Sequence, residues 1–195
     1  MQSRNINSLT LEELEEVLAG WAEEPFHARQ IFSWVYQKGI ENFAEMTNLP
    51  LDLRRKLKER FYVGDLKLLE TLKSIDGTKK LLFELKDKNL IEAAIIPAEK
   101  RVSGCISTQV GCKFCCRFCA SAMLGFKRHL CASEILDEIW YLKNNSPNRK
   151  LTHIVFMGIG EPLDNYENVL KAIRFINSGF TYNIGARRIT ISTCG

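Results

Sequence analysis

The chain has 195 residues, enough for one substantial domain or for a small domain followed by part of a larger one. Its composition, 46% apolar and 26% charged, is ordinary for a soluble globular protein, and a net charge of +4 from 27 basic and 23 acidic residues identifies no partner. No apolar run approaches the ~18–20 residues of a transmembrane helix, and the N-terminus lacks the apolar segment of a secretory signal, so we expect a cytoplasmic protein.

Residues 1–62 predict a helical module. Thr10-Leu11-Glu12-Glu13 has the pattern of a capping box, and leucines follow it at helical spacing until Gly20. A second helix is expected from about Phe26 to Lys38, with Gly39 as its stop, and a third over Leu51–Phe61. The outward face of the third helix is basic, which is typical of a solvated face but also of a surface for RNA phosphates; it carries Arg54, Arg55, Lys58 and Arg60.

Residues 63–98 change to the pattern of strands. Three branched and apolar runs, separated by Asp76-Gly77 and by Lys86–Asn89, predict antiparallel hairpins; the runs are Leu66–Ser74, Lys79–Leu85 and Leu90–Ile96. A small β-meander therefore links the helical module to the C-terminal half of the chain.

From Arg101 onward strands and helices alternate. Strands are expected over Ser103–Val110, Thr152–Met157 and Arg188–Thr193, and helices from Ser133 to about Lys143 and over Asn165–Ser178. This order predicts an α/β layer or barrel with parallel strands, whose functional loops gather at the C-terminal strand ends. The loops that come after the three predicted strands should therefore converge.

These patterns predict an α/β fold in three parts. They are a helical accessory domain at 1–62, a β-meander linker at 63–98, and the N-terminal part of an incomplete (β/α) barrel at 99–195. The chain stops after its third parallel strand, which would leave open sheet edges and half a core, so we expect it to be a piece of a longer protein.

Seven cysteines are an odd number, clustered in a chain without a secretory signal, which favours metal and thiol chemistry in a reducing compartment over a disulfide framework. Four of them lie in Cys112–Cys119. They form either Cys112-x3-Cys116-x2-Cys119 with Cys115 as a passenger, or two abutting C-x2-C pairs. Structural zinc sites separate such pairs by about 12–20 residues, so the three-cysteine pattern is favoured. Three thiolates on a cubane of four irons leave one iron open to a small molecule.

Two other features flank these cysteines. Between Lys100 and Ser133 there are six Lys or Arg residues, one His and no acid, which indicates an anionic partner or charge balance for a metal–thiolate cluster. Gly160-Glu161-Pro162 follows an apolar strand, where a carboxylate can accept hydrogen bonds from an ammonium group. Alone, this tripeptide would be a tight turn with a solvated Glu, and Ser192 at the next strand end would be structural.

Together these motifs resemble the RlmN/Cfr family of radical S-adenosylmethionine (SAM) enzymes, which methylate an adenine ring carbon in ribosomal RNA. The resemblance covers nearly the whole chain. Gly-Glu-Pro-Leu at 160–163 favours the RlmN branch, which acts at adenine carbon 2 of 23S rRNA and of some tRNAs, over the Cfr branch, which acts at carbon 8. The matching stretches are Phe26–Tyr36, Met46–Pro50, Glu92, Cys105–Cys112, Gly125–Arg128, Met157–Leu163 and Arg188–Thr193.

The resemblance implies a role for each matching residue. Cys112, Cys116 and Cys119 would ligate a [4Fe-4S] cluster, and Gly160, Glu161 and Ser192 would contact SAM. Glu92 matches the family's proposed proton acceptor, and Cys105 matches the thiol that releases the product from a protein–RNA crosslink and is left in a transient disulfide. Carbon 2 of adenine is electron-poor, so the family transfers the methyl group through a methylated cysteine activated by a radical.

The resemblance also implies partners and a limit. We expect 23S rRNA and tRNA as substrates, a flavodoxin- or ferredoxin-type reductant, no membrane and a monomer. The methyl-carrying cysteine belongs to the family's C-terminal part, which this chain lacks, so we expect no RNA methylation by the chain alone. No role is assigned to Cys115, Cys131 or Cys194. The alternatives are another radical SAM reaction, such as that of an activase or maturase, and an electron-transfer or zinc-stabilised RNA-binding module.

Overall fold

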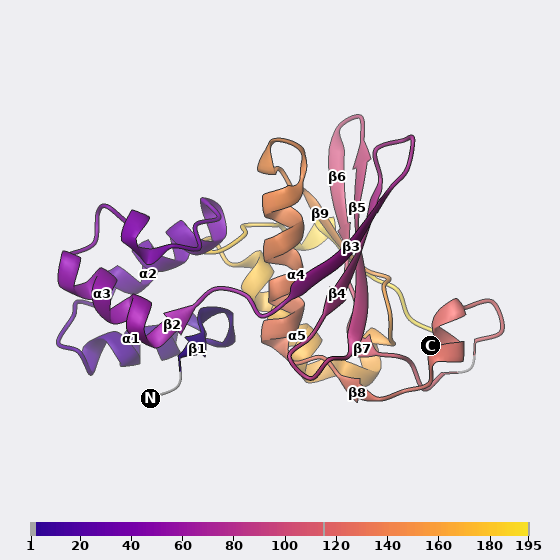
Figure 1. Ribbon diagram of the computed structural model, residues 1–195, viewed down its shortest axis with the longest axis horizontal. Coiled ribbons are helices and arrows are strands. Elements are labelled where there is room, and N and C mark those ends of the chain that lie inside the picture. The colour runs from indigo at the N-terminus through magenta and orange to yellow at the C-terminus, as the bar shows by residue number, and fades with distance from the viewer. Residues whose placement is uncertain (1–2, 115, 195) are drawn as a thin grey trace.

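A computed structural model describes residues 3–114 and 116–194. Its N-terminal part is a helical module closed by a short parallel pair of strands, β1 (Arg4–Asn5) and β2 (Phe61–Tyr62). Between these strands lie α1 (Leu11–Ala19), α2 (Phe26–Phe32) and α3 (Leu51–Arg60), at one end of the molecule (Figure 1).

The predicted capping box at the start of α1 is confirmed. The Thr10 hydroxyl accepts the Glu13 N–H at 3.2 Å, and a Glu13 carboxylate oxygen accepts the Thr10 N–H at 2.7 Å. The second helix continues beyond α2 as a π-helical turn over Ser33–Gln37. The inner faces of the helices form a closed apolar core of Leu14, Leu18, Ala28, Ile31, Phe32, Leu53 and Leu57.

One six-stranded sheet dominates the rest of the chain. Its strand order is β10-β9-β6-β5-β4-β3, antiparallel from β3 to β6 and parallel from β6 to β10. The predicted meander and the predicted barrel portion therefore share one sheet, which is not closed into a barrel over the described residues. The strands are β3 (Lys67–Lys73), β4 (Lys79–Glu84), β5 (Leu90–Ala98), β6 (Arg101–Cys105), β9 (His153–Phe156) and β10 (Ile189–Ile191).

The strand predicted over Ser103–Val110 is interrupted. It ends as β6 at Cys105 and resumes as β7 (Gln109–Val110), which pairs with β8 (Arg128–His129) in a separate two-stranded sheet. The chain leaves the main sheet at Ile106–Thr108 because these residues turn inward and are buried. This departure places the cysteine loop, which comes after β7, beyond the end of β6.

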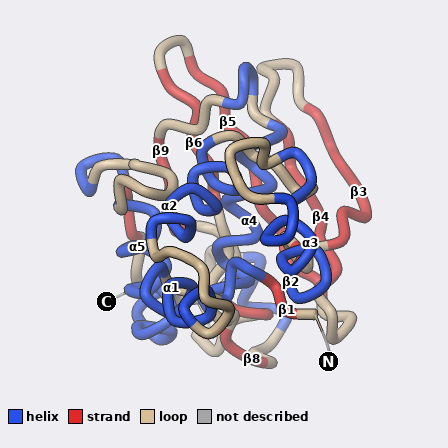
Figure 2. Tube along the Cα trace, turned by 90° about the vertical axis from the view of Figure 1, so that its left-hand side faces the viewer, coloured by secondary structure: helices blue, strands red, loops and turns tan. Residues whose placement is uncertain are grey.

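Helices α4 (Ala132–Asn145) and α5 (Tyr166–Asn177) cover one face of the sheet and lie between it and the N-terminal module (Figure 1). On β5 the residues of the covered face, Ile91, Ala93 and Ile95, are buried, whereas Glu92 on the other face is half-buried. Figure 2 looks at the molecule from the side of the module, which lies in front of α4. Within the described ranges, no helix is long and apolar enough to cross a membrane.

A buried carboxylate on α4 joins the module to the sheet domain. Asp137 accepts hydrogen bonds from the side-chain amides of Asn5, at 2.9 and 3.1 Å, and of Asn7, at 2.5 Å, and from the N–H of Asp65 at 2.8 Å. Burial raises its pKa to about 7, although the bonds from Asn7, Asn5 and Asp65 act in the opposite direction. The interface between the two parts therefore includes a buried polar cluster beside the aromatic contacts of Phe32 and Tyr36 with Phe175.

This carboxylate should make stability fall as pH rises. The folded-state pKa of Asp137 is raised from 3.8 to about 7, so its contribution is fully present below pH 3.8 and is lost as pH rises to about 7. In urea titrations, the unfolding free energy of the wild type should fall by roughly 1 kcal/mol per pH unit in this window relative to Asp137→Asn. If the pH profiles of the wild type and of Asp137→Asn run parallel, the pKa of Asp137 is the same in the folded and the unfolded protein, and the prediction is wrong.

Candidate functional site

Three loops meet where the parallel strands end. Gln109, at the start of β7, accepts the backbone N–H of Glu161 through Oε1 at 2.9 Å. Glu161, in the loop after β9, accepts the backbone N–H of Cys194 through Oε2 at 2.9 Å, and Cys194 follows β10. The predicted meeting of these strand-end loops is therefore present in the structure.

Glu161 is a buried carboxylate prepared to carry a charge. Burial alone would raise its pKa, but hydrogen bonds from the N–H groups of Cys194 and Leu163, together with the Thr193 side chain, hold the pKa below its usual range. An ionised carboxylate of this kind can accept hydrogen bonds from a ligand's ammonium group.

The other two residues predicted to contact SAM lie on either side of Glu161. Gly160 adopts a φ of +105° and lies against the Gln109 side chain, which a Cβ at this position would meet at 2.6 Å. Ser192 is exposed, and its N–H donates to the Phe156 carbonyl at 3.3 Å, which extends the pairing of β10 with β9. Gly160 therefore allows the close approach of two loops, whereas the Ser192 side chain faces solvent.

The cysteine loop carries free thiols. Cys112, Cys116 and Cys119 are partly buried and unpaired, and Cys115 lies outside the described residues. Cys116 and Cys119 line a hollow of about 400 Å³ together with Arg117. In the described ranges no three Cys, His, Asp or Glu residues are gathered as metal ligands, so the ligand set remains a prediction. The donor chemistry fits an iron–sulfur cluster, since the thiols are soft ligands with no partner.

Cys194 connects this loop to Glu161. Desolvation, a hydrogen bond to Glu161 and the nearby charges of Glu161 and Cys116 raise the pKa of the Cys194 thiol. The electrostatic influence of Cys116 indicates that the middle cysteine of the predicted triad is near Cys194. Sequence reasoning gave Cys194 no role, and in the structure its backbone N–H fixes the Glu161 carboxylate.

Acidic side chains from elsewhere in the chain pair with part of the basic segment around the cysteines. Lys113 forms an ion pair with Asp164, and Arg128 binds both oxygens of Glu134 at 2.8 Å and Asp87 at 2.6 Å. These cations are engaged in holding the loop and β8 in place. Arg117, on the cysteine loop, is exposed.

Cys105 and Glu92 lie on the sheet face that α4 and α5 leave uncovered. Cys105 pairs with Ala94, and Glu92 lies two residues before Ala94 on the same face of β5. A Glu92 oxygen lies 2.7 Å from Lys80 Nζ, and Glu92 lines a hollow of about 420 Å³ with Lys127. Burial, reinforced by Glu138, raises the pKa of the Cys105 thiol to about 11, so the thiol is protonated at neutral pH.

Cys131 has a structural place that the sequence did not predict. The helix expected to start at Ser133 starts at Ala132, with Cys131 as its N-cap, and the Cys131 N–H donates to Glu134 at 2.9 Å. Cys131 is exposed and lies outside the cysteine loop.

Sequence reasoning missed the buried polar residues beneath the site. Gln109 donates to Asp164 at 2.8 Å besides holding Glu161, and Asn165 donates to the carbonyls of Thr108 and Leu130. Ser107 is also fully buried. The only signal was a run of three polar residues, Ser107–Gln109, after an apolar strand, and such a run is equally typical of an exposed strand end.

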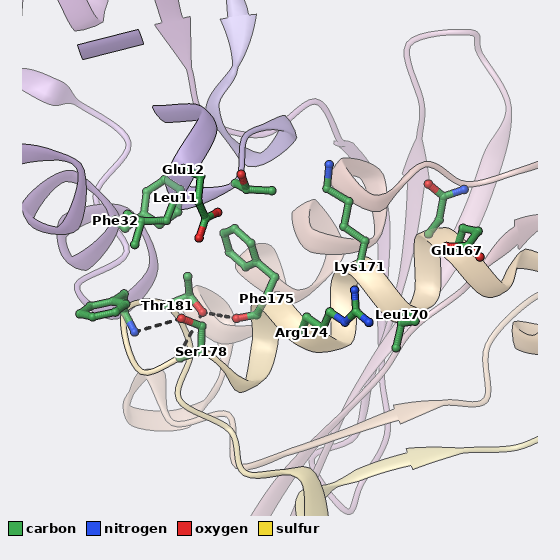
Figure 3. A pocket seen from close by; sticks show the side chains of 13 residues that line it. Leu11, Glu12, Phe32, Glu167, Leu170, Lys171, Arg174, Phe175, Ser178 and Thr181 are labelled. Atoms are coloured by element: carbon green, nitrogen blue, oxygen red, sulfur yellow. Dashed lines mark hydrogen bonds between the residues drawn. The ribbon is translucent and has the colours of Figure 1, made fainter. Parts of the chain in front are cut away.

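A separate hollow of about 680 Å³ lies between α5 and helices α1 and α2 (Figure 3). Phe32 and Phe175 contribute to its wall, and Lys171 extends from α5. The hydroxyl of Thr181 donates to backbone carbonyls of its own segment, as Figure 3 shows. None of the residues that line this hollow belongs to the predicted site.

The cysteine loop should depend on Gly111, which has a φ of +72°. A Cβ at Gly111 would lie 1.6 Å from the Gly125 carbonyl oxygen, whereas a Cβ at Gly125, with a φ of +63°, would meet nothing within 4 Å. In urea unfolding, Gly125→Ala should cost about 1–3 kcal/mol from backbone strain alone, because Gly125 has a ψ of 161°. Gly111→Ala should cost roughly 2 kcal/mol more than Gly125→Ala, because it adds the clash with the Gly125 carbonyl. Equal costs would show that the two loop ends do not touch.

Comparisons with known proteins identify what the chain is similar to. A family model described as the ribosomal RNA large subunit methyltransferase N-terminal domain matches residues 4–63, and the radical SAM superfamily model matches residues 106–195. Proteins named probable dual-specificity RNA methyltransferase RlmN are similar to the chain: those of Clostridium perfringens (strain SM101) and Geobacillus kaustophilus are 45% and 46% identical over 193 residues. These alignments cover 98% of this chain and 55% and 53% of the relatives.

A solved structure gives the same result. The crystal structure of a radical SAM methyltransferase from Sphaerobacter thermophilus matches with a TM-score of 0.91 and 39% identity, over 98% of this chain and 57% of that chain. The chain thus spans about half the length of the curated relatives it matches. With the RlmN N-terminal domain and a radical SAM domain in one chain, the protein belongs to the RlmN family of the radical SAM superfamily, of which it covers the N-terminal portion.

Proposed function

We propose that the chain is the N-terminal portion of a radical SAM methyltransferase that methylates carbon 2 of a specific adenine in 23S rRNA and in tRNAs. The observation that carries this proposal is the Glu161 carboxylate, held in its charged form by backbone N–H groups at the edge of the Cys112-x3-Cys116-x2-Cys119 loop. Relatives named as dual-specificity RNA methyltransferases support the substrate class.

The residues of the site divide into two groups. Cys112, Cys116 and Cys119 would hold a [4Fe-4S] cluster, and Gly160, Glu161 and Ser192 would hold SAM. When bound, these cofactors supply the carbon radical that abstracts a hydrogen atom from a methyl group. Glu161 contributes the charge that binds the ammonium group of SAM, because its carboxylate is already ionised before the ligand arrives.

Cys105 and Glu92 serve the later part of the reaction. The Cys105 thiol, with its pKa raised to about 11, must lose its proton before it can attack a crosslinked product. Glu92 lies on the same face of the sheet and is paired with Lys80, so its carboxylate can accept a proton from the adenine ring. The described cysteines are free, as is needed before a transient disulfide forms in turnover.

The wider setting belongs to the same proposal. The substrates are 23S rRNA and tRNA, electrons come from a flavodoxin- or ferredoxin-type protein, and the protein acts as a cytoplasmic monomer. The helical module, residues 1–62, would contact RNA. Of the basic side chains on the outward face of α3, Arg54 and Arg55 are bound to groups of the module itself, namely the carbonyls of Leu49 and Ala44 and the carboxylate of Asp52.

Anaerobic reconstitution with iron and sulfide tests the metal site. The wild-type chain should bind four irons per chain with broad absorbance near ~400 nm. Cys112→Ala, Cys116→Ala and Cys119→Ala should each lower iron content by more than about half, because each removes one of three protein ligands. The matched control is Cys131→Ala, which removes an exposed thiol outside the loop and should leave iron content unchanged. A colourless zinc protein, or cluster loss in Cys115→Ala but not in Cys116→Ala, would reject this ligand set.

RNA methylation is tested with the product of the complete gene. Reconstituted protein, SAM, a reduced flavodoxin and unmodified 23S rRNA or tRNA should yield 2-methyladenosine, identified by nucleoside mass spectrometry against both isomeric standards. Formation of 8-methyladenosine would assign the protein to the other branch, and formation of neither would reject the proposal. The 195-residue chain alone should form no product, since the resemblance places the methyl-carrying cysteine outside the part of the family that it covers; turnover by this chain would contradict that view.

A further inference from the structure

Ser107 lies at a crossing point of three segments of the site. Its hydroxyl donates to the Glu92 carbonyl at 2.7 Å and accepts the Ile159 N–H at 2.9 Å. Its own N–H donates to a carboxyl oxygen of Glu138 at 3.0 Å. The side chain is completely buried, so its hydrogen bonds have no competition from solvent.

Ser107 and the two partners of its hydroxyl are close in the chain to residues of the proposed reaction. Glu92 is itself the proposed proton acceptor, Cys105 lies two residues before Ser107, and Glu161 lies two residues after Ile159. β5, the end of β6 and the loop after β9 therefore share one hydroxyl group.

Glu138 provides the base of this arrangement. It is fully buried in α4, and burial raises its pKa well above the usual value, which favours the neutral acid. Oε2 accepts the Ser107 N–H, and Oε1 has no hydrogen-bond partner among the described residues. Among the described residues, the cost of burying this carboxyl group is offset by one hydrogen bond, from the Ser107 N–H, which indicates that Glu138 holds that residue.

We propose that Ser107, held by the Glu138 carboxyl, is a positioning residue that fixes the Glu92 backbone, the Cys105 strand end and the loop of Glu161 relative to one another. What those three residues do rests on the proposed function, whereas the hydrogen bonds that hold them do not. Loss of the hydroxyl removes a donor to the Glu92 carbonyl and the acceptor of the buried Ile159 N–H, so the three segments should separate locally.

The test on the 195-residue chain compares Ser107→Ala with Thr108→Val. Thr108 is the matched control, because it is the next residue, is equally buried, and its hydroxyl has no hydrogen-bond partner within the described ranges. Two local readouts are measured: alkylation of Cys105 by iodoacetamide and hydrogen exchange of the Ile159 amide. Trypsin leaves Cys105 and Cys112 on one peptide, residues 102–113, so tandem mass spectrometry must assign the label.

Ser107→Ala should raise both local rates about tenfold, and Thr108→Val should change them less than about twofold, while amides at the centre of α4 keep their protection. Acceleration of the α4 amides by the same factor would reveal general destabilisation and overturn the proposal. Unchanged rates at Cys105 and Ile159 would overturn it as well.

If Ser107→Ala fails to fold, two variants of Glu138 provide a second test of the same proposal. Glu138→Gln keeps an acceptor for the Ser107 N–H and should retain wild-type rates, whereas Glu138→Leu should reproduce the faster rates expected for Ser107→Ala. If Glu138→Gln and Glu138→Leu give the same alkylation and exchange rates, the hydrogen bond between Glu138 and the Ser107 N–H has no positioning role.

The link to the reaction is measured with the product of the complete gene. Ser107→Ala should lower kcat by about tenfold or more, because the reacting groups are no longer held at fixed positions relative to one another. The KM for RNA should change little, because the substitution does not alter the surface that binds RNA. A rise in KM alone would overturn the positioning role. If the wild type forms no methyladenine, the proposed function fails, but the alkylation and exchange results still decide the local claim.

Discussion

Two adjacent buried acids on α4 connect the two parts of the molecule to its site. Asp137 faces the N-terminal module and binds Asn5, Asn7 and the backbone of Asp65. Glu138, one residue on and about 100° around the helix, faces the sheet and holds Ser107 at the end of β6. α4 is therefore the element against which both the module and the strand ends are placed, and each of these contacts is a hydrogen bond to a buried carboxyl group.

This arrangement explains why the strand ends can carry so many polar groups. The chain leaves the sheet after Cys105, and backbone groups of Ile106–Gln109 then bind β9 and the loop after it, Leu130, and the side chains of Glu138 and Asn165. Gln109 extends the same scheme outward to Glu161 and Asp164. The cysteine loop starts from this fixed platform, so the position of Cys112 is set by buried amides and hydroxyls rather than by the loop itself.

The sequence predicted the elements better than it predicted these connections. The capping box at Thr10, the α3 boundaries and the strand-end location of Glu161 follow from local patterns, because caps, helix faces and strand–loop order are local properties. The interruption of the strand after Cys105, the N-cap role of Cys131 and the buried pair of Asp137 and Glu138 were not predicted. The buried acids depend on partners far away in the chain: 31 residues separate Ser107 from Glu138, and 132 separate Asn5 from Asp137. A polar residue on a helix is expected to face solvent unless such a partner is known. The Cys131 cap depends on Glu134, only three residues away, but cysteine is not among the residue types preferred at N-caps.

Three carboxyl groups show how the fold places charge. Glu138 accepts one hydrogen bond in a fully buried setting, and its pKa is raised well above the usual value. Asp137 accepts several, and its pKa is raised only to about 7. Glu161, also buried but held by two backbone N–H groups, has a lowered pKa. In each case burial raises the pKa of the carboxyl group and donated hydrogen bonds lower it, and the balance of the two decides its charge. The fold thereby favours the neutral form of Glu138 and leaves Asp137 only partly ionised at neutral pH, and it places a stable negative charge at the strand ends, where a cationic ligand group can reach it.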